Sequence, residues 1–329
     1  SAASEPQKSS SPSVERIFPH QPCQIVSATF WRQKNKSQRS QTGRKKGKKE
    51  RLNYELQQIE IIGSERGSHR NGNENPSSRQ ATAEEKEILS RYSGFGGIKE
   101  VLNIGTDKPI SGDMQEPIQR LQELINAYPH FTEPMRHNVI EGIKASVLTA
   151  FYTPKFLVDA VVRQIHATFS ENGLKMRSFL EPSAGIGGFL PIAMSGTYDY
   201  AIEKDLISGM ILSLLHENTL TRTAAFETIG EQGFEHTTFD VIASNIPFGN
   251  FRVFDAELWK KGGMYEQATK TIHNYFFVKA MELLNEGGLL AFITSRGIAD
   301  TPGNKFVREY LVNHADLISA IRLHDLQDI

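Results

Sequence analysis

The fold of this 329-residue chain is decided by one stretch, Phe179-Leu180-Glu181-Pro182-Ser183-Ala184-Gly185-Ile186-Gly187-Gly188-Phe189. Apolar residues precede Glu181, as at the end of a buried strand, and glycines follow it. Glycine lets the backbone turn tightly from a strand into a helix and approach a ligand closely, while N–H groups at the helix start face that ligand. The spacing differs from the GxGxxG of dinucleotide-binding turns, and many α/β proteins have a glycine turn for packing alone. The stretch predicts an α/β fold with a candidate ligand site.

Short β-type runs alternate with helical stretches on both sides of this turn. The predicted strands are 178–181, 198–202, 222–226, 239–244, 289–294 and 317–323, and predicted helices include 206–218, 269–284 and 305–313. A further helix follows Tyr152, with Thr153 as its cap and Pro154 at its first position. Nearly all-apolar strands alternating with helices indicate a Rossmann-like, mainly parallel sheet with helices on both faces. Ligands bind such sheets at the carboxyl ends of the strands.

A carboxylate closes the second of these strands. Glu203 follows Tyr200-Ala201-Ile202 and lies 22 positions after Glu181 (203 − 181). An acid at about this distance from a glycine turn can accept both hydroxyls of an adenosine ribose. The alternative is a solvated charge beside Lys204 and Asp205, and the glycine turn favours the ribose interpretation.

The fourth strand runs directly into a polar-Pro-aromatic tetrapeptide, Asn245-Ile246-Pro247-Phe248. The exocyclic amine of adenine is a poor nucleophile, because its lone pair is delocalised into the ring. An Asn oxygen and a nearby backbone carbonyl can accept its two hydrogens, which favours a pyramidal nitrogen whose lone pair points at a methyl donor. An aromatic ring then holds the target base, which has to leave the helix to reach this site. In isolation, an Asn-Pro turn after a strand is common.

The net charge of −1 conceals an asymmetry between the two ends of the chain. Residues 1–80 hold 15 Lys and Arg against 7 Glu, a net +8, so residues 81–329 carry −9. The basic excess is concentrated in 32–51, which is poor in apolar residues, so we expect residues 1–80 to be a disordered basic arm. The arm is either a solubilising tail or a phosphate-binding segment. A small helical prelude is predicted over 81–148, beginning at Thr82 and interrupted by glycines at Ser93-Gly94-Phe95-Gly96-Gly97.

Composition excludes several classes of protein. The longest apolar runs are far too short to cross a bilayer, and no basic-then-apolar signal segment opens the sequence. Cys23 is the only cysteine, so neither an internal disulfide nor a cysteine-based metal site is expected. A cytoplasmic protein with no membrane partner and no metal is the default expectation.

Taken together, these motifs resemble those of N6-adenine DNA methyltransferases. The resemblance covers about residues 85–323, and the motifs agree in order and spacing. It rests on Ala150-Phe151-Tyr152-Thr153-Pro154, Glu181–Gly188, Glu203, Phe226, Asn245-Ile246-Pro247-Phe248 and the stretch from Asn274 through Gly287–Ser295. With Tyr92-Ser93-Gly94-Phe95-Gly96-Gly97, the set is similar to the methylase part of large methylase–helicase polypeptides of bacterial mobile elements.

The resemblance implies a function and a set of site residues. An S-adenosylmethionine-dependent domain would occupy 149–329 and methylate adenine N6 in duplex DNA, at a flipped base, as in restriction-modification. The cofactor would contact Tyr152, Thr153, Pro154, Glu181, Pro182, Ala184, Gly185, Gly187, Glu203 and Phe226. The catalytic residues would be Asn245, Ile246, Pro247 and Phe248. The resemblance also implies a partner within the same longer polypeptide, namely a C-terminal helicase or target-recognition region.

Three departures from the family pattern are visible. Ile246 replaces the usual first proline, although it still offers a backbone carbonyl and Pro247 keeps it extended. Ala225 stands where many relatives have an acid that contacts the cofactor's adenine amine. The chain stops at Ile329, before the last hairpin strand and any DNA-reading domain, and no GxxxxGK[ST] motor motif occurs. We therefore expect a fragment or truncated product, incomplete at the C-terminus.

Two other functions fit the same motifs. The tetrapeptide also serves methyltransferases that act on RNA adenine or on a protein glutamine. A non-catalytic module that binds cofactor or nucleic acid inside a larger assembly is the alternative from another class. The basic arm and the narrower resemblance favour DNA.

Overall fold

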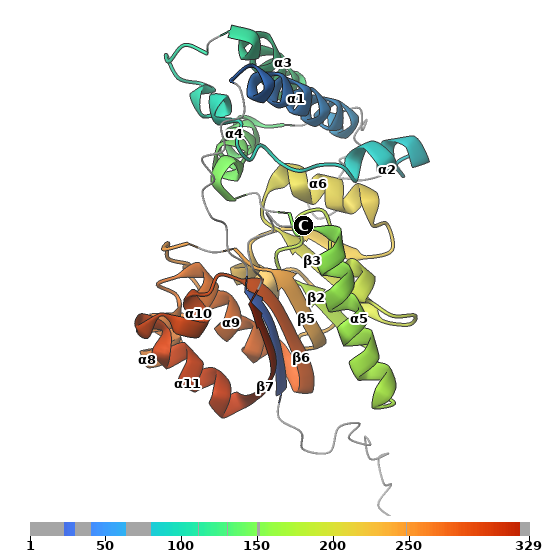
Figure 1. Cartoon of the computed structure of the whole chain (residues 1–329), viewed down its shortest axis with the longest axis vertical. Coiled ribbons are helices and arrows are strands. Elements are labelled where there is room, and N and C mark those ends of the chain that lie inside the picture. Colours follow the sequence, from blue (N-terminus) through green and yellow to red (C-terminus); the bar gives the residue numbers. More distant parts are fainter. Residues whose placement is uncertain are drawn as a thin grey trace, which may run out of the picture.

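The computed structural model describes residues 23–29, 41–63, 80–110, 112–129, 131–149, 152–247 and 249–322. A helix-covered sheet forms one part of the molecule, and a layer of helices lies against the end of that sheet at which the strand arrows point (Figure 1). For 23–29, 41–46, 148–149 and 322, only the backbone is described. The disorder expected of 1–22, 30–40 and 64–79 lies outside the described residues.

The sheet has seven described strands in the order β4-β3-β2-β5-β6-β1-β7, and every pairing is parallel. The strands are β1 (Cys23–Thr29), β2 (Ser178–Glu181), β3 (Tyr198–Glu203), β4 (Leu220–Thr223), β5 (Phe239–Asn245), β6 (Leu284–Thr294) and β7 (Ala315–Arg322). The predicted Rossmann-like architecture is therefore confirmed. The predicted strand 222–226 is wrong: pairing ends at Thr223, and Phe226 begins a short 3-10 helix, Phe226–Glu231.

Successive residues of the central strands point to opposite faces, as pleated strands require. Leu180, Ile242 and Leu290 join the apolar cluster on the face of α9 (Ile272–Leu283) and α11 (Lys305–His314). Their neighbours Phe179, Val241 and Leu289 join the cluster beneath α5 (Lys155–Glu171). Both faces of the sheet are therefore buried, which explains why these strands read as continuous apolar runs.

Helices cover both faces of the sheet (Figure 1). Besides α5, α9 and α11, the described helices of this part are α6 (Leu206–Leu215), α7 (Ala256–Lys261), α8 (Gly263–Ala268) and α10 (Gly297–Asp300). The start of α5 corrects one prediction. Pro154 is the N-cap rather than the first helical residue, and no side chain caps the helix. The Pro154 carbonyl accepts from the N–H groups of Leu157 and Val158 at 3.0 and 3.2 Å.

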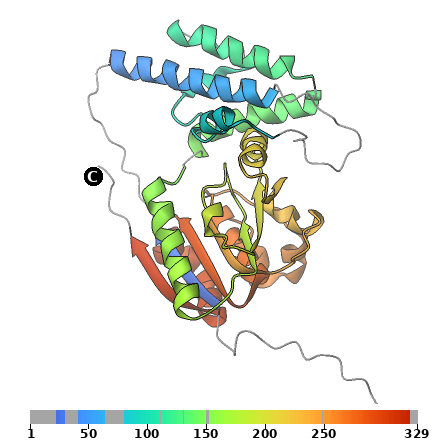
Figure 2. The ribbon, with the colours of Figure 1, turned by 90° about the vertical axis from the view of Figure 1, so that its right-hand side faces the viewer.

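The helical layer contains α1 (Gln41–Gly63), α2 (Ala83–Leu89), α3 (Gln115–Ala127) and α4 (Glu133–Thr149), with short 3-10 turns at Lys99–Asn103 and Gly112–Met114. Thr82 caps α2 in a capping box with Glu85, as the sequence predicts. Figure 2 shows the layer stacked on the sheet-containing part. Ile207, Ile211 and Leu214 of α6 share one buried cluster with the helical layer, so this layer and the sheet-containing part have a common core.

The prediction of a disordered basic arm over 1–80 is wrong for two segments, β1 and α1. In α1, Leu52, Leu56, Ile59 and Ile62 recur every three or four residues and are 0–3% exposed, so the helix buries an apolar stripe that the basic composition of 32–51 conceals. Strand β1 lies between β6 and β7, with Gln24 paired to both Leu289 and Asp316. Strand β7 forms one edge of the sheet, and β1, from the N-terminal part of the chain, separates it from β6.

Candidate functional site

The glycine turn wraps around a buried carboxylate at the end of β2. Glu181 is 1% exposed, and both its oxygens accept from the backbone N–H of Phe189, at 3.2 and 3.3 Å. Burial raises the pKa of Glu181 well above its ordinary value. Gly185 and Gly187 have φ of 56° and 88°, which favours glycine at both positions. A Cβ on Gly187 would lie 2.5 Å from the His216 ring, so the turn has no room for a side chain there.

Glu203, at the end of β3, is held against this turn by two backbone donors. The Gly185 N–H donates to Oε2 and the Asp205 N–H to Oε1, each at 2.7 Å. Burial is the main cause that raises the pKa of Glu203 to about 7, and the nearby Asp205 charge adds to it. The carboxylate is half-buried and fixed in position, unlike the solvated charge of the alternative interpretation.

The tetrapeptide begins at the same edge, where β5 ends. The Ser244 hydroxyl donates to the Ser183 carbonyl at 3.0 Å, which joins the end of β5 to the glycine turn. The next residue, Asn245, closes β5. Ile246 is 1% exposed in the core, and its N–H donates to the Ile293 carbonyl at 3.0 Å. Pro247 is half-buried, and Phe248 lies outside the described residues.

Tyr152 connects the helical layer to the glycine turn. A Cβ on Gly185 would approach the Tyr152 ring to 3.3 Å, and that ring forms an edge contact with Tyr92, with 6.1 Å between centroids. Burial raises the pKa of both phenols. Thr153 and Pro154 follow in the same half-buried segment.

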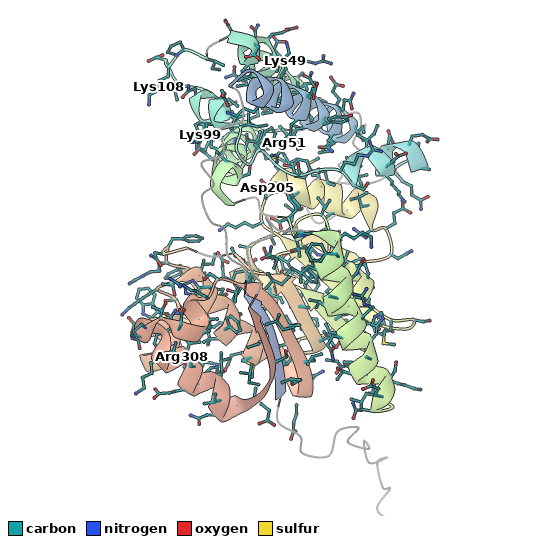
Figure 3. All side chains as sticks on the ribbon, in the orientation of Figure 1. Lys49, Arg51, Lys99, Lys108, Asp205 and Arg308 are labelled. Atoms are coloured by element: carbon teal, nitrogen blue, oxygen red, sulfur yellow. The ribbon has the colours of Figure 1, made fainter. Side chains whose placement is uncertain are left out.

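Arg51 holds the Tyr92–Gly97 turn in place. Its guanidinium donates to the carbonyls of Ser93, Gly94 and Gly96 at 2.8–3.0 Å. The Ser93 hydroxyl donates to Glu55 on the same helix as Arg51 at 3.1 Å, and burial raises the pKa of Glu55 to about 7. Figure 3 shows Arg51 on the underside of α1 and Asp205 below it. Nothing in the sequence indicated this contact, because backbone carbonyls have no residue signature.

The remaining predicted cofactor residues are two residues of this turn and Phe226, which begins the 3-10 helix after β4, and all three are buried. Pro182 and Ala184 are buried within it, and the Ala184 N–H donates to the Ile202 carbonyl at 2.9 Å. Phe226 is 3% exposed and packs against Phe276 and Tyr275, at centroid distances of 4.9 and 6.1 Å. Its place as a flank for the cofactor's adenine stays a prediction.

A buried polar network lies at the start of α9, and no sequence pattern indicated it. Asn304 accepts from Asn274 at 2.8 Å, donates to the Gly297 carbonyl at 2.8 Å and lies 3.3 Å from His273 Nε2. Burial lowers the pKa of His273. The network therefore joins the start of α9 to the segment that follows β6.

The site has the donors and acceptors that S-adenosylmethionine requires. Each Glu203 oxygen accepts one backbone bond and has a further lone pair with which a ribose hydroxyl can bond. The turn at 185–187 brings backbone close to any ligand above it. Among the described residues, no group of His, Cys, Asp or Glu is placed to hold a metal ion. No helix in the described ranges is long and apolar enough to cross a membrane.

A hollow of about 500 Å³ lies between α2, the glycine turn and the end of α6. Its lining includes Lys86, Ser90, Gly187 and His216, and neither Glu203 nor Asn245 is among the lining residues. The hollow is therefore separate from the carboxyl-end site.

A parallel sheet of this order, with a glycine turn and an acid at the next strand end, has the arrangement of the S-adenosylmethionine-dependent methyltransferase class. More particularly, residues 194–329 match the model of the Eco57I restriction-modification methylase family. S-adenosylmethionine is the cofactor of this class.

The individual proteins that this chain resembles share limited sequence identity with it. The chain is 29% identical over 187 residues to defense against restriction protein B of Escherichia phage P1, and this match covers 55% of the chain and 8% of that protein. A type I restriction-modification methyltransferase subunit from Streptococcus thermophilus superposes with a TM-score of 0.42 at 13% identity, covering 60% of this chain and 48% of the subunit. A 16S rRNA N2 G1207 methyltransferase of T. thermophilus has a TM-score of 0.28 at 25% identity, with 43% and 34% of the chains covered.

Proposed function

We propose that this chain transfers a methyl group from S-adenosylmethionine to the N6 amine of an adenine in DNA. The observation that carries the proposal is the meeting of two motifs at one edge of the sheet. The Glu203–Gly185 pair at β3 and β2 lies beside the end of β5, where the Ser244–Ser183 bond at 3.0 Å brings Asn245 next to the glycine turn. A cofactor site and an amide acceptor for the amine are therefore neighbours.

The residues of the chain have separate parts in the proposed reaction. Glu203 accepts the ribose hydroxyls, and the turn around Gly185 approaches the rest of the cofactor. S-adenosylmethionine supplies the electrophilic methyl group. The Asn245 oxygen and the Ile246 carbonyl accept the two amine hydrogens, so that the nitrogen lone pair is aimed at the methyl carbon. The N–C bond forms as the C–S bond breaks, and the amine then gives up one proton.

The proposed mechanism is compatible with isoleucine at position 246, where relatives have proline. Its side chain fills the core and its N–H is bonded to the Ile293 carbonyl at 3.0 Å. That bond fixes the Asn245–Ile246 peptide, which directly precedes the peptide that carries the second proposed acceptor, whereas a proline ring would restrict residue 246 through φ. The substitution therefore keeps the loop stiff.

DNA is preferred to RNA or protein glutamine because the matched family is one of restriction-modification methylases. The assay offers methyl-tritiated S-adenosylmethionine with duplex DNA, RNA and protein, and identifies the product by mass spectrometry. N6-methyladenine in DNA is the expected product. Label in RNA or glutamine alone contradicts the proposal, and cofactor binding with no transfer indicates a non-catalytic module.

A further inference from the structure

The segment that follows the tetrapeptide exposes an unusual density of aromatic side chains. Phe251, Phe254 and Trp259 are 48%, 66% and 43% exposed. The described residues contain six exposed aromatic side chains, and these three fall within nine positions of one another. Single exposed apolar residues need no explanation, but a cluster of them marks a site of interaction.

Buried neighbours and hydrogen bonds anchor the loop and helix that carry these exposed rings. Val253 and Leu258 are buried, and the Val253 N–H donates to the Thr269 carbonyl at 2.9 Å. Asp255 caps α7 and accepts from the Tyr275 hydroxyl at 2.9 Å. Phe254 and Trp259 contact each other edge to face, with centroids 5.5 Å apart. The aromatic residues are therefore presented on an anchored loop and helix.

Basic side chains lie among these rings in sequence. Arg252, Lys260 and Lys270 are exposed, and none forms an ion pair with any residue that the structure describes. Two of the three acids of the segment, Asp255 and Glu257, contact one buried cation, Lys279, at 2.9 and 3.2 Å. Residues 251–270 hold four Lys and Arg against three Asp and Glu, a net charge of +1 (4 − 3).

The chemistry of this surface fits one class of partner. Protein interfaces are depleted of lysine at their cores, whereas surfaces that bind single-stranded nucleic acid combine cations for phosphates with aromatic rings for bases. The surface is adjacent to the site, since a Cβ on Gly249 would lie 2.9 Å from the Phe251 ring and Gly249 follows the tetrapeptide.

We infer that Phe251, Phe254 and Trp259, with Arg252 and Lys260, bind the unstacked bases and phosphates of a DNA strand beside the target adenine. The inference rests on the proposed function and adds to it the surface that receives the substrate. A base that leaves the duplex exposes its neighbours, and the rings take up those exposed faces.

The test measures binding of a fluorescein-labelled 20-nucleotide DNA single strand by anisotropy, with the full chain and without turnover. Stacking energies predict that Phe254→Ala and Trp259→Leu each weaken binding roughly 5- to 100-fold, while Trp259→Phe retains most of it. Arg252→Gln and Lys260→Gln are each expected to lower the slope of log affinity against log salt by about 0.7, the value for one phosphate that is no longer neutralised. Thermal unfolding checks that each variant is folded.

Matched controls lie at the opposite end of the sheet. Tyr198, 57% exposed at the start of β3, is replaced by Ala, and the exposed Lys175 before β2 by Gln. Unchanged binding in both, with weaker binding by the variants of the aromatic surface, supports the inference. Equal weakening in controls and variants, equal affinity of Trp259→Leu and wild type, or no binding by wild type overturns it. Because binding is read without methyl transfer, a chain that binds here but methylates no DNA contradicts only the proposed reaction.

Discussion

Arg51 on α1 donates through Nη2 to the carbonyl of Gly94, at 2.8 Å, across 43 positions of sequence. The same guanidinium holds the carbonyls of Ser93 and Gly96. Through Tyr92, this turn touches Tyr152, and Tyr152 touches Gly185 of the cofactor turn. A helix from the basic N-terminal region is thus connected to the cofactor site through a short chain of contacts.

Replacing Arg51 is expected to weaken cofactor binding and stability without changing how DNA binding depends on salt. Arg51→Ala leaves three carbonyls without a charged donor, and bonds of this kind contribute about 1.5–3 kcal/mol each, although not additively. Calorimetry with S-adenosylmethionine and thermal unfolding measure the two effects. Lys49→Ala is the control, because it removes the same charge from a loose 3.7 Å pair with the exposed Glu116.

The opposite result would favour the phosphate-binding alternative for the basic N-terminal segment over the solubilising tail. In that case Arg51→Ala and Lys49→Ala would lower DNA affinity alike, with cofactor affinity unchanged. The salt slope on duplex DNA would then fall by about 0.9 for each phosphate that the arm no longer neutralises.

Cofactor affinity is expected to depend on pH through Glu203. Its pKa of about 7 lies above the ordinary 4.5, so the carboxylate that accepts ribose hydroxyls is protonated as pH falls through about 7. Affinity should then drop toward tenfold per pH unit, as linkage requires. Glu203→Gln should bind about 1–3 kcal/mol more weakly at high pH and show no such pH dependence. Titrations by calorimetry from about pH 6 to pH 8 measure the effect.

Glu55 provides the control for this pH profile. Its pKa is also raised to about 7 by burial, but it is not placed to touch the cofactor. A raised carboxyl pKa means that the folded state holds the proton more tightly, so stability falls as pH rises from about 4.5 to about 7. Glu55→Gln should remove part of that fall and leave the pH dependence of cofactor affinity in place. A wild-type affinity that is flat across this range would remove Glu203 from the ribose site.

Asn245→Ala is expected to abolish methyl transfer and leave cofactor affinity nearly unchanged. The substitution removes the amide acceptor of the target amine and none of the bonds that hold Glu203 or the glycine turn. Phe248→Ala should instead weaken DNA binding by roughly 1–3 kcal/mol, the value of one base stacked on an aromatic ring. Single-turnover rates and calorimetric affinities separate the effects. Wild-type turnover in Asn245→Ala would show that the assigned chemistry is wrong.

Ile246→Pro introduces the residue that relatives use and is nevertheless expected to destabilise this chain. Proline has no N–H for the Ile293 carbonyl, and it does not fill the space of a side chain that is 1% exposed. An unsatisfied buried carbonyl costs about 1–3 kcal/mol, and the poorer packing adds to that. Urea unfolding measures the change, with Ile246→Val, which keeps the N–H, as the milder control. A proline variant as stable as wild type would show that the loop adapts freely.

Strand ends and their acids were accessible from the sequence because buried parallel strands read as apolar runs. The strand Ser178–Glu181 has the predicted bounds, and Glu203 and Asn245 both end strands as expected. The sequence placed the end of β4 at Phe226, three residues after the pairing ends at Thr223. Ala224, Ala225 and Phe226 continue the apolar character after Thr223, although the chain has already left the sheet.

The packing of the helical layer could not be predicted from the same patterns. In α1 the charge of 44–51 dominates the composition, while the apolar spacing that buries the helix begins only at Leu52. Contacts such as Arg51 with the Ser93–Gly96 carbonyls depend on the path of a distant turn. Sequence periodicity reports which face of an element is buried, and it does not report which backbone atoms that element meets.

The position of β1 has a consequence for how the molecule is made. Gln24 pairs with Leu289, 265 positions away (289 − 24), and with Asp316. On a ribosome, this strand emerges before the other six described strands and waits for partners that are synthesised much later. Loop closure over such a span is entropically costly, and contacts of this range slow folding. The β2–β5 part of the sheet can assemble during synthesis, so the first of these strands to leave the ribosome is among the last to find its place.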